Sequence, residues 1–592
     1  MARPIETDVL IVGSGPAGSA CALALSTYGI PNMVVTKYRW LADTPRAHIT
    51  NQRTMEVLRD LGVEDEVNEK RAHQELMGNN VFCTSLAGEE IGRLLSWGNH
   101  PNRKADYTLA SPTTICDVPQ DLMEPILFSN ACRRGTRARF DTEYRSLVQD
   151  GSGVTATVRD RLGGGDYEIR AKYLVGADGG RSKVAEDIGL PMVGKMGVGG
   201  SMNIVFEADL SRFVAHRPSV LYWVLQPGAD IGGIGMGLVR MVRPWNKWLI
   251  VWGYDIDGEP PEMNDALATS VAHHLIGDDT VPIKIDSYSL WTVNHLYAER
   301  NTRGRVFCMG DAVHRHPPSN GLGSNTSIQD AYNLAWKLAY VLTGRAGPAL
   351  LDSYDAERSP VARQIVERAN KSIGEFGPIF DSLGLLSTRD PAQMKRNMDA
   401  RKDNTPEAAV QRERLRAAIA HKTYEFNAHG VEMNQRYASG AVVSDGTEAP
   451  PFRRDPELFY EATTRPGARL PHVWLERGGR TMSSLDLVGQ GRFTLLTGIG
   501  GEAWADAAAA VGRARGLEVA AVVIGPGRDA HDIFGDWAQM RETGETGCVL
   551  VRPDQHVAFR APAVVPDARS ALAAAFDHVL GAVAAPVPPP EG

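Results

Sequence analysis

The sequence predicts an α/β protein in which a mostly parallel sheet is interrupted by an inserted antiparallel sheet and followed by a smaller α/β unit. Three observations predict it. A strand, a glycine turn and a helix open the chain in TDVLIVGSGPAGSACALAL, strand-like runs rich in β-branched and aromatic residues fill about 191–295, and strand and helix patterns alternate again beyond 441. At 592 residues the chain exceeds one ordinary core, so several domains are expected.

The opening element carries a GxGxxG pattern made by Gly13, Gly15 and Gly18. In a strand–turn–helix setting the first glycine permits the turn, the second lets the backbone approach a pyrophosphate, and the third allows close helix packing. The helix that begins at Pro16 and Ala17 supplies the positive end of its dipole. This pattern predicts a Rossmann-like dinucleotide site.

One feature of such sites is missing. The acidic residue that usually binds a ribose about 20 residues after the glycines is absent, and the strand VVTKY brings Thr36 and Lys37 there instead. A hydroxyl at Thr36 can bond the ribose, or Lys37 can meet a phosphate.

The inserted sheet is predicted from NIVFEADL, SVLYWVLQP, WLIVWGYD and KIDSYSLWTVNHL. After it, NTSIQDAYNLAWKLAYVL predicts an amphipathic helix with one apolar face, formed by Ile328, Ala331, Leu334, Ala335 and Leu338. The expected domains are a discontinuous dinucleotide-binding domain at 1–190 and 296–370, the inserted sheet at 191–295 with part of 75–115 as a further contributor, a helical connection at 371–440, an α/β unit at 441–585 and a disordered tail at 586–592.

Composition excludes several classes of function. Lysine and arginine total 63 against 71 acidic residues, a net charge of -8 without a basic block, so no nucleic-acid partner is expected. The chain has neither a signal-like start nor an apolar run of about 18 residues, which predicts a cytoplasmic protein without membrane contact. The six cysteines lack CxxC spacing, so no metal site or disulfide framework is expected.

Two further motifs follow strand-like runs. The first, VGADGGRS, places Asp178 between glycines, either as the cap of a tight turn or because a ligand lies against this backbone. The second is GDAVHRHPPSNGLGSN, which begins at Gly310 and Asp311.

The order and content of GSGPAG, GADGGRS and GDAVHRHPPSNGLGSN resemble the single-component FAD-dependent aromatic hydroxylases over about 1–370. The strings TPRAHITNQRTMEVLRDLG, ELMGNNVFCTSLAGEE and MVRPWNKW are similar to the phenol- and chlorophenol-hydroxylating members. The resemblance implies that Asp311 contacts the ribityl or ribose of FAD, and that Arg46 and Gln120 hold its phosphate or ribityl portion. Without the resemblance, these last two are interpreted as a surface salt bridge and a helix cap. The full set of implied cofactor-binding residues is Gly13, Gly15, Pro16, Ala17, Gly18, Thr36, Lys37, Arg46, Gln120, Asp178, Asp311, Pro318, Gly321, Leu322, Gly323 and Asn325.

The chemistry implied by the resemblance uses FAD, NADPH or NADH, and O2. The nicotinamide reduces FAD, oxygen adds at the flavin C4a to give a hydroperoxide, and an electron-rich phenol attacks its distal oxygen, ortho to the hydroxyl. No second GxGxxG follows a strand, in keeping with a family that has no separate nicotinamide domain. The expected partner is a small aromatic substrate.

Three residues are the candidates for work on the substrate. His48 falls where the resemblance places an aspartate that interacts with the phenol hydroxyl, and an imidazole suits the role of base. Strand alternation in SVLYWVLQP sends Tyr222 and Val224 to one face, and Tyr222 is expected to orient the phenol hydroxyl. Trp291 is a third candidate, although aromatic residues on sheets are more often core.

The unit at 441–585 resembles the thioredoxin-like tail of these hydroxylases, and without CxxC it implies an architectural or dimer-supporting role in a homo-oligomer. Two alternatives stay open: a tailoring hydroxylase of a larger hydroxypyridine or polyketide, and a flavin-binding protein without turnover. A flavin-dependent halogenase is not indicated, because WxWxIP is missing.

Overall fold

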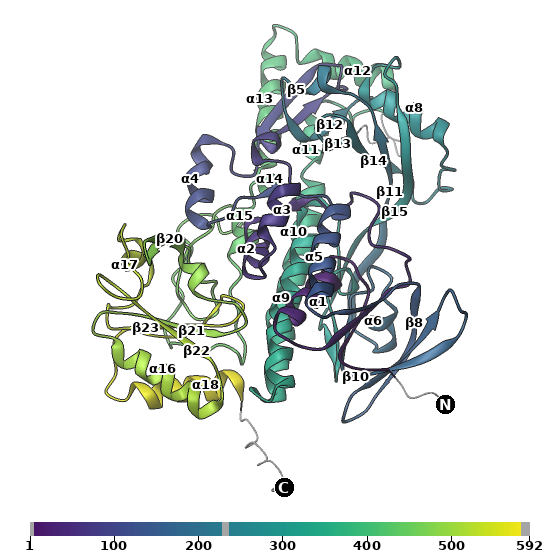
Figure 1. Ribbon diagram of the computed structural model, residues 1–592. Coiled ribbons are helices and arrows are strands. Elements are labelled where there is room, and N and C mark those ends of the chain that lie inside the picture. Colours follow the sequence, from purple (N-terminus) through teal and green to yellow (C-terminus); the bar gives the residue numbers. More distant parts are fainter. Residues whose placement is uncertain (1–4, 228–235, 582–592) are drawn as a thin grey trace.

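Three main sheets organise the chain in the computed structural model, which describes residues 5–227 and 236–581 (Figure 1). The predicted disordered tail at 586–592 lies outside the described residues.

The first sheet is the predicted parallel sheet of the dinucleotide-binding body. Its central path, in spatial order, is β16 (Thr302–Arg303), β17 (Val306–Cys308), β10 (Asp166–Gly176), β1 (Ile5–Val12), β2 (Asn32–Val35) and β7 (Arg137–Arg139). Off this path, β9 (Val154–Asp160) pairs with β10, and β8 (Thr142–Gln149) pairs with β9. The strands from β17 to β7 run parallel. The strand segment 9–12 is buried throughout, as expected for a parallel sheet covered on both faces.

The helix α1 (Pro16–Thr27) packs between α5 (Gln120–Arg133) and α9 (Gly323–Leu342). The prediction of a helix here is confirmed for α9, but the prediction of a single apolar face is wrong, because every residue from Asn325 to Tyr340 is buried. The C-terminal unit covers the side that was expected to meet water (Figure 1).

The second sheet is the inserted one, and its largely antiparallel character is confirmed. Its strands, in spatial order, are β18 (His314–Arg315), β15 (Lys284–Ala298), β11 (Met192–Glu207), β14 (Lys247–Tyr254), β13 (Met236–Arg243), β12 (Ser219–Leu225), β4 (Asn79–Cys83) and β5 (Glu90–Leu95). Only the β12–β4 pairing is parallel among them. The sequence patterns did not predict β13 as a strand. One face of the sheet packs on α8 (Asp265–Ile276).

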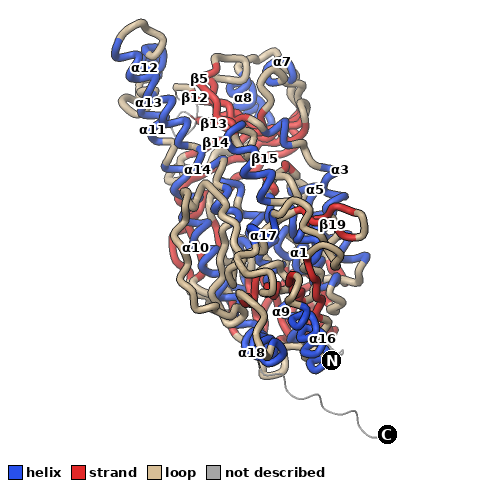
Figure 2. The backbone as a smooth tube through the Cα atoms, turned by 90° about the vertical axis from the view of Figure 1, so that its left-hand side faces the viewer, coloured by secondary structure: helices blue, strands red, loops and turns tan. Residues whose placement is uncertain are grey.

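Helices join the two bodies to the C-terminal unit. The long α10 (Asp352–Gly374) runs beside α9, and Figure 2 shows α11, α12 and α13 gathered at one end of the molecule, where α13 contacts β5. The remaining helices are α2 (Gln52–Asp60), α3 (Glu64–Lys70), α4 (Pro101–Ala110), α6 (Lys183–Asp187), α7 (Ser211–Val214), α11 (Gly377–Ser382), α12 (Pro391–Ala400), α13 (Pro406–His421), α14 (Thr423–Phe426), α15 (His429–Met433) and α17 (Asp536–Met540).

The C-terminal unit has a four-stranded sheet in the order β22 (Val519–Ile524), β21 (Phe493–Gly498), β23 (Cys548–Val551) and β24 (Val557–Ala561). The first two strands in the chain are parallel and the last two form an antiparallel pair, with α16 (Glu502–Arg515) and α18 (Ala568–Leu580) packed together. This is the arrangement expected of a thioredoxin-like unit. A hairpin of β19 (Trp474–Arg477) and β20 (Arg480–Ser483) precedes it.

Across residues 5–227 and 236–581, no helix has both the length and the apolar character needed to cross a membrane. The same residues contain no group of three or more His, Cys, Asp or Glu side chains arranged to hold a metal ion.

Candidate active site and cofactor site

The predicted cofactor motifs meet at one edge of the first sheet. β1, β2, β10 and β17 are neighbouring parallel strands, so their carboxyl ends lie side by side. The residues that follow them are Gly13, Thr36, Ala177 and Met309. In open α/β sheets, the crevice outside the carboxyl ends of the strands is where ligands bind.

The three glycines of the first motif have different neighbours. Gly13 has φ +108°, and a Cβ there would lie 2.2 Å from the carbonyl oxygen of Ala177. A Cβ on Gly18 would lie 2.0 Å from the carbonyl oxygen of Gly13. At Gly15 the nearest atom would be Glu124 Oε1, at 4.0 Å. Gly13 and Gly18 are therefore required by chain packing, whereas the backbone at Gly15 is open to a ligand.

The third motif packs onto the first. Gly310 has φ +62°, and a Cβ there would lie 3.0 Å from the Cβ of Ala17. Farther along the same motif, Gly321 has φ +64°, and its Cβ would meet that of Ile49 at 2.9 Å. The GDAVHRHPPSNGLGSN segment thus spans from the start of α1 to the strand that follows His48.

Two helix N-termini in this region could hold negatively charged parts of a cofactor. The N-cap positions are Gly15 for α1 and Leu322 for α9, and neither has a side-chain cap. The first N–H groups of such helices point out of the helix and attract negative charge. The N–H groups of Gly15 and Ala17 could donate to a pyrophosphate, whereas Pro16 has no N–H, and the N–H groups following Leu322 could face a second electron-rich group.

Asp178 caps a helix. Its Oδ1 accepts from the Ser182 hydroxyl at 2.5 Å, and its Oδ2 accepts from the Val184 N–H at 3.1 Å, at the start of α6. Burial raises the pKa of Asp178. The Asp178 side chain therefore caps the turn before α6. The tight backbone contact at this motif is made by Ala177 and Asp178 with Gly13.

The other predicted cofactor residues lie around the same edge. Gln120 starts α5 and donates to Glu124 Oε1 at 2.6 Å, and Glu124 Oε2 accepts from the Ala42 N–H at 2.7 Å. Asn325 donates to the carbonyl oxygens of Ile49 and Gly321, at 2.7 and 2.6 Å. Thr36 and Leu322 are buried, Gly321 and Gly323 are half-buried, and the exposed members are Lys37, Arg46, Asp311 and Pro318.

His48 contacts a buried carboxylate. It precedes the two-residue strand β3 (Ile49–Thr50), which pairs with β6 (Cys116–Asp117). Nδ1 of His48 lies 2.5 Å from Oδ2 of Asp117. Burial lowers the pKa of His48, the charge of Arg240 lowers it further, and Asp117 opposes both without cancelling them. The lowered pKa favours the neutral imidazole, which is the form able to accept a proton.

Arg240 of β13 connects the second sheet to the dyad formed by His48 and Asp117. Its guanidinium donates to the carbonyl oxygens of Pro45 and Arg46, and its Nη2 lies 3.8 Å from Asp117 Oδ1. Only 2% of Arg240 is exposed. The face of the second sheet that carries Arg240 is therefore the face turned toward His48.

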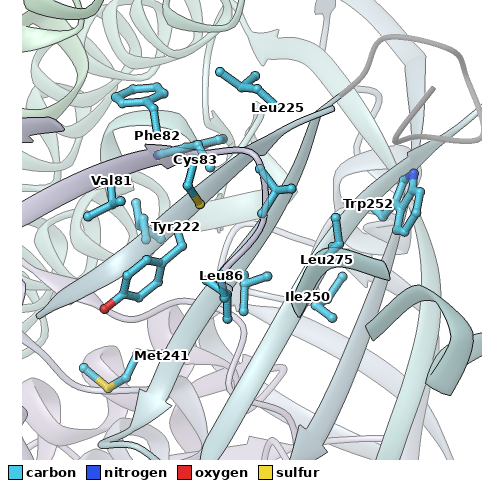
Figure 3. Packing of buried hydrophobic residues seen from close by; sticks show 14 of the residues in the cluster. Val81, Phe82, Cys83, Leu86, Tyr222, Leu225, Met241, Ile250, Trp252 and Leu275 are labelled. Atoms are coloured by element: carbon cyan, nitrogen blue, oxygen red, sulfur yellow. The ribbon is translucent and has the colours of Figure 1, made fainter. Parts of the chain in front are cut away.

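Tyr222 lies on the opposite face, a position that gives no support to the expectation that it orients the substrate. In the β12–β13 register Arg240 pairs with Leu221, and Tyr222 pairs with Val239. Successive side chains of a strand point to opposite faces. Figure 3 shows Tyr222 within the buried cluster that includes Val81, Cys83, Leu86, Met241 and Leu275.

The hydroxyl of Tyr222 is already engaged by main-chain groups. It donates to the Arg217 carbonyl at 3.1 Å and accepts from the Ser219 N–H at 3.0 Å. Burial raises the pKa of this hydroxyl. Its contacts are those of a core tyrosine.

Trp291 lies on the same face as Arg240. Its indole N–H donates to Asn203 Oδ1 at 2.9 Å, and Asn203 pairs with Val251, which pairs with Leu238 of β13. Leu238 and Arg240 are two residues apart and share a face. Trp291 is half-buried, so its ring is available to a substrate on this face.

Sequence reasoning missed Asp117 and Arg240. The only signals were an arginine inside the apolar run MGLVRMVR and an aspartate three residues before Gln120. Neither pattern says that the two side chains meet, because they come from different sheets.

A family model described as an FAD binding domain matches residues 6–369, and a second, described as the C-terminal part of aromatic-ring hydroxylases, matches residues 463–583.

Two curated relatives match almost the whole chain. The 2,4-dichlorophenol 6-monooxygenase of Delftia acidovorans is 59% identical over 98% of this chain and 99% of its own. The phenol 2-monooxygenase of Pseudomonas sp. (strain EST1001) is 52% identical over 98% of this chain and 93% of its own. Among solved structures, the flavin-dependent monooxygenase PieE in complex with FAD and substrate has a TM-score of 0.94 and 45% identity, covering 98% of this chain and 100% of PieE.

Proposed function

This chain belongs to the FAD-binding aromatic-ring hydroxylases, and we propose that it hydroxylates a small phenol ortho to the ring hydroxyl, with His48 as the proton acceptor. The enzymes of this family use FAD, NAD(P)H and O2. Both the resemblance stated from its motifs and the expected monooxygenase activity are thus confirmed at the level of the family.

The observation that carries the proposal is the position of His48. The next residue, Ile49, packs on Gly321, and Asp117 holds the His48 ring. The sheet face that carries Arg240 and Trp291 is turned toward His48. A neutral imidazole in this position is suited to take the proton of a phenol. Loss of that proton makes the ortho carbon more electron-rich, which is what attack on an electrophilic oxygen requires.

The cofactor is proposed to lie along the carboxyl edge of the first sheet. Gly15, Pro16 and Ala17 would hold its pyrophosphate, Thr36 or Lys37 its ribose, and Asp311 its ribityl or ribose hydroxyls. The segment 318–325 would contact the flavin ring. With FAD bound there and reduced by NAD(P)H, the site would activate dioxygen, of which one atom would enter the ring and the other would leave as water.

The protein's own part is orientation, proton acceptance and exclusion of water. Trp291 and Asn203 offer a flat ring and an amide on the sheet face turned toward His48. The relatives named for phenol and 2,4-dichlorophenol support a single-ring substrate. The likeness to PieE, solved with FAD and substrate, makes a larger tailoring substrate the second candidate.

The test is NADPH and NADH consumption by the FAD-loaded protein with phenol, 2,4-dichlorophenol or a hydroxypyridine, with product and peroxide both measured. A single-ring phenol should accelerate consumption and give a catechol with little peroxide. If only the hydroxypyridine does so, the tailoring function is correct. If no ring accelerates consumption, the proposed substrate class is wrong.

We also propose self-association. Val193, Met196 and Val198, close together at the start of β11, are large apolar residues that are 37–44% exposed. Such surfaces are commonly covered by a partner. Sedimentation equilibrium of the full chain should show a dimer or larger assembly, and a monomer at all concentrations would contradict this.

A further inference from the structure

The contact between His48 and Asp117 determines which ring nitrogen of His48 is free. Asp117 is fully buried, and its Oδ2 lies 2.5 Å from Nδ1 of His48. An ionised carboxylate can only accept a hydrogen bond, so Nδ1 carries the proton and Nε2 carries the lone pair. Nε2 is therefore the nitrogen that can accept the proton of a phenol.

Asp117 stays ionised because positive charge surrounds it. Burial alone would raise its pKa, but His48, which donates a hydrogen bond from Nδ1 and adds a positive charge once it is protonated, and then the permanent charge of Arg240 outweigh that effect and hold the pKa of Asp117 below its ordinary value. Arg240 Nη2 and Asp117 Oδ1 are 3.8 Å apart, and neither atom has a hydrogen-bond partner within the described chain. Their interaction is therefore one of charge across a short gap.

Arg240 also fixes the segment that carries His48. Its Nη1 donates to the carbonyl oxygens of Pro45 and Arg46, two and three residues before His48. The guanidinium thus acts on the backbone beside the histidine and on the carboxylate that orients its ring. Both contacts reach out of the second sheet, one to the loop before His48 and the other to the β3–β6 pair that carries Asp117.

We propose that Asp117 and Arg240 are positioning residues that act on His48 with opposite electrostatic effects. Asp117 fixes the ring and stabilises the imidazolium formed when the phenol O–H bond breaks and an Nε2–H bond forms, leaving a phenolate. Arg240 holds the loop and keeps Asp117 an anion, but its charge disfavours the imidazolium. The inference rests on the proposed function, in which His48 is the base.

The charged groups around the dyad make the two effects separable. Asp117 and Arg240 act on His48 directly, Arg243 acts on Asp117 and Arg240, and Asp121 acts on Arg240. A base must be neutral to work, so the hydroxylation rate falls on the acid side of the pKa of His48. Asp117 raises that pKa and Arg240 lowers it. Removing each charge should therefore move the acid limb of the pH profile in opposite directions.

The experiment measures coupled hydroxylation of simple phenol, whose hydroxyl titrates near pH 10 as that of tyrosine does, from pH 5 to 8 in the FAD-loaded enzyme. Asp117→Asn should lower the maximal rate at least tenfold and move the acid limb to lower pH. Arg240→Gln should move the limb to higher pH, and Arg240→Lys, which keeps the charge, should leave it at the wild-type position. Asp121→Asn is the matched control, because it removes a nearby carboxylate that does not contact His48, and its limb should also stay in place.

Two outcomes overturn the inference: limbs that move in the same direction, or an Asp117→Asn enzyme with the wild-type rate and limb. His48→Ala separates this from a failure of the proposed function. If His48→Ala retains the rate and the limb, His48 is not the base. If His48→Ala loses activity while Asp117→Asn does not, His48 is the base but Asp117 does not position it. Should Arg240→Gln not fold, as FAD content and melting would show, the limbs of Asp117→Asn and Arg240→Lys decide the result.

Discussion

Glu357 of α10 and Arg552 of the C-terminal unit form a two-point ion pair, with Oε1 2.6 Å from Nη1 and Oε2 2.9 Å from Nη2. Both side chains are fully buried. Lys337 of α9 donates to the same Glu357 Oε2 at 2.8 Å, and Arg552 also pairs with Asp554. The thioredoxin-like unit therefore completes a charge network that begins inside the cofactor-binding body.

Removing Arg552 should destabilise the whole chain. Arg552→Met leaves Glu357 and Asp554 with one fewer buried cation, and breaking such a pair costs about 3–5 kcal/mol. Urea unfolding of the variant measures this. The matched control is Arg515→Met, which breaks a pair to Asp577, whose side chain is 63% exposed, and should cost less than about 1 kcal/mol. Equal losses in the two variants would contradict the role given to the network.

The same network predicts sensitivity to acid. Burial would raise the pKa of Glu357, but Arg552 and Lys337 outweigh it and hold the pKa well below the ordinary 4.5. A carboxyl whose folded pKa is depressed contributes stability that is present above its unfolded pKa and is lost as pH falls toward the folded pKa. The free energy of unfolding should therefore decline as pH falls below about 4.5. In Arg552→Met this decline should be smaller, and an unchanged decline would show that other carboxyls cause it.

Alanine substitutions at Gly13 and Gly15 of the first motif should affect different properties, folding stability for Gly13 and FAD binding for Gly15. Gly13→Ala forces a side chain into the Ala177 carbonyl at a positive φ, so folding stability should fall by more than about 2 kcal/mol. Gly15→Ala meets no atom closer than 4.0 Å, so the apoprotein should melt normally while FAD binds at least tenfold more weakly. Thermal melting of apoprotein and flavin titration separate these effects. Normal FAD binding by Gly15→Ala would remove Gly15 from the cofactor site.

Substitutions at Tyr222 and Trp291 should have different effects, on stability for Tyr222 and on substrate binding and coupling for Trp291. Tyr222→Phe removes the bond to the Arg217 carbonyl and leaves the Ser219 N–H unpaired, a cost of about 1–3 kcal/mol in stability. Its KM for phenol and its coupling of NAD(P)H to product should stay at wild-type values. Trp291→Phe, on the face that carries Arg240, should raise KM or peroxide release instead. A raised KM in Tyr222→Phe alone would reverse the assignment of the two faces.

The cofactor edge could be predicted from the sequence because its signals are local. Gly13, Gly15 and Gly18 lie within one turn, and the order of strand, turn and helix fixes where such a turn sits in a parallel sheet. The single apolar face predicted for α9 was wrong because the burial of its other side depends on a distant part of the chain. Whether its second side meets water depends on the C-terminal unit, which comes more than a hundred residues later.

The substrate side could be predicted only in part. Strand alternation correctly separated Tyr222 from its neighbours, but alternation does not say which face of a sheet the rest of the chain will cover. That choice depends on Arg240 reaching Asp117, a contact between two sheets. His48 was found through resemblance alone, and nothing in the sequence says that Asp117 is its partner.

The most direct test of the proposed function is a turnover experiment under oxygen-18 gas, with FAD-loaded protein, NADPH or NADH, and phenol or 2,4-dichlorophenol. Mass spectrometry of the product should show one labelled oxygen atom in a catechol, formed in step with nicotinamide oxidation, and His48→Ala should bind FAD normally yet form far less product. An unlabelled product, or peroxide that accounts for all the oxidised nicotinamide with every phenol tested, would contradict phenol hydroxylation by this chain.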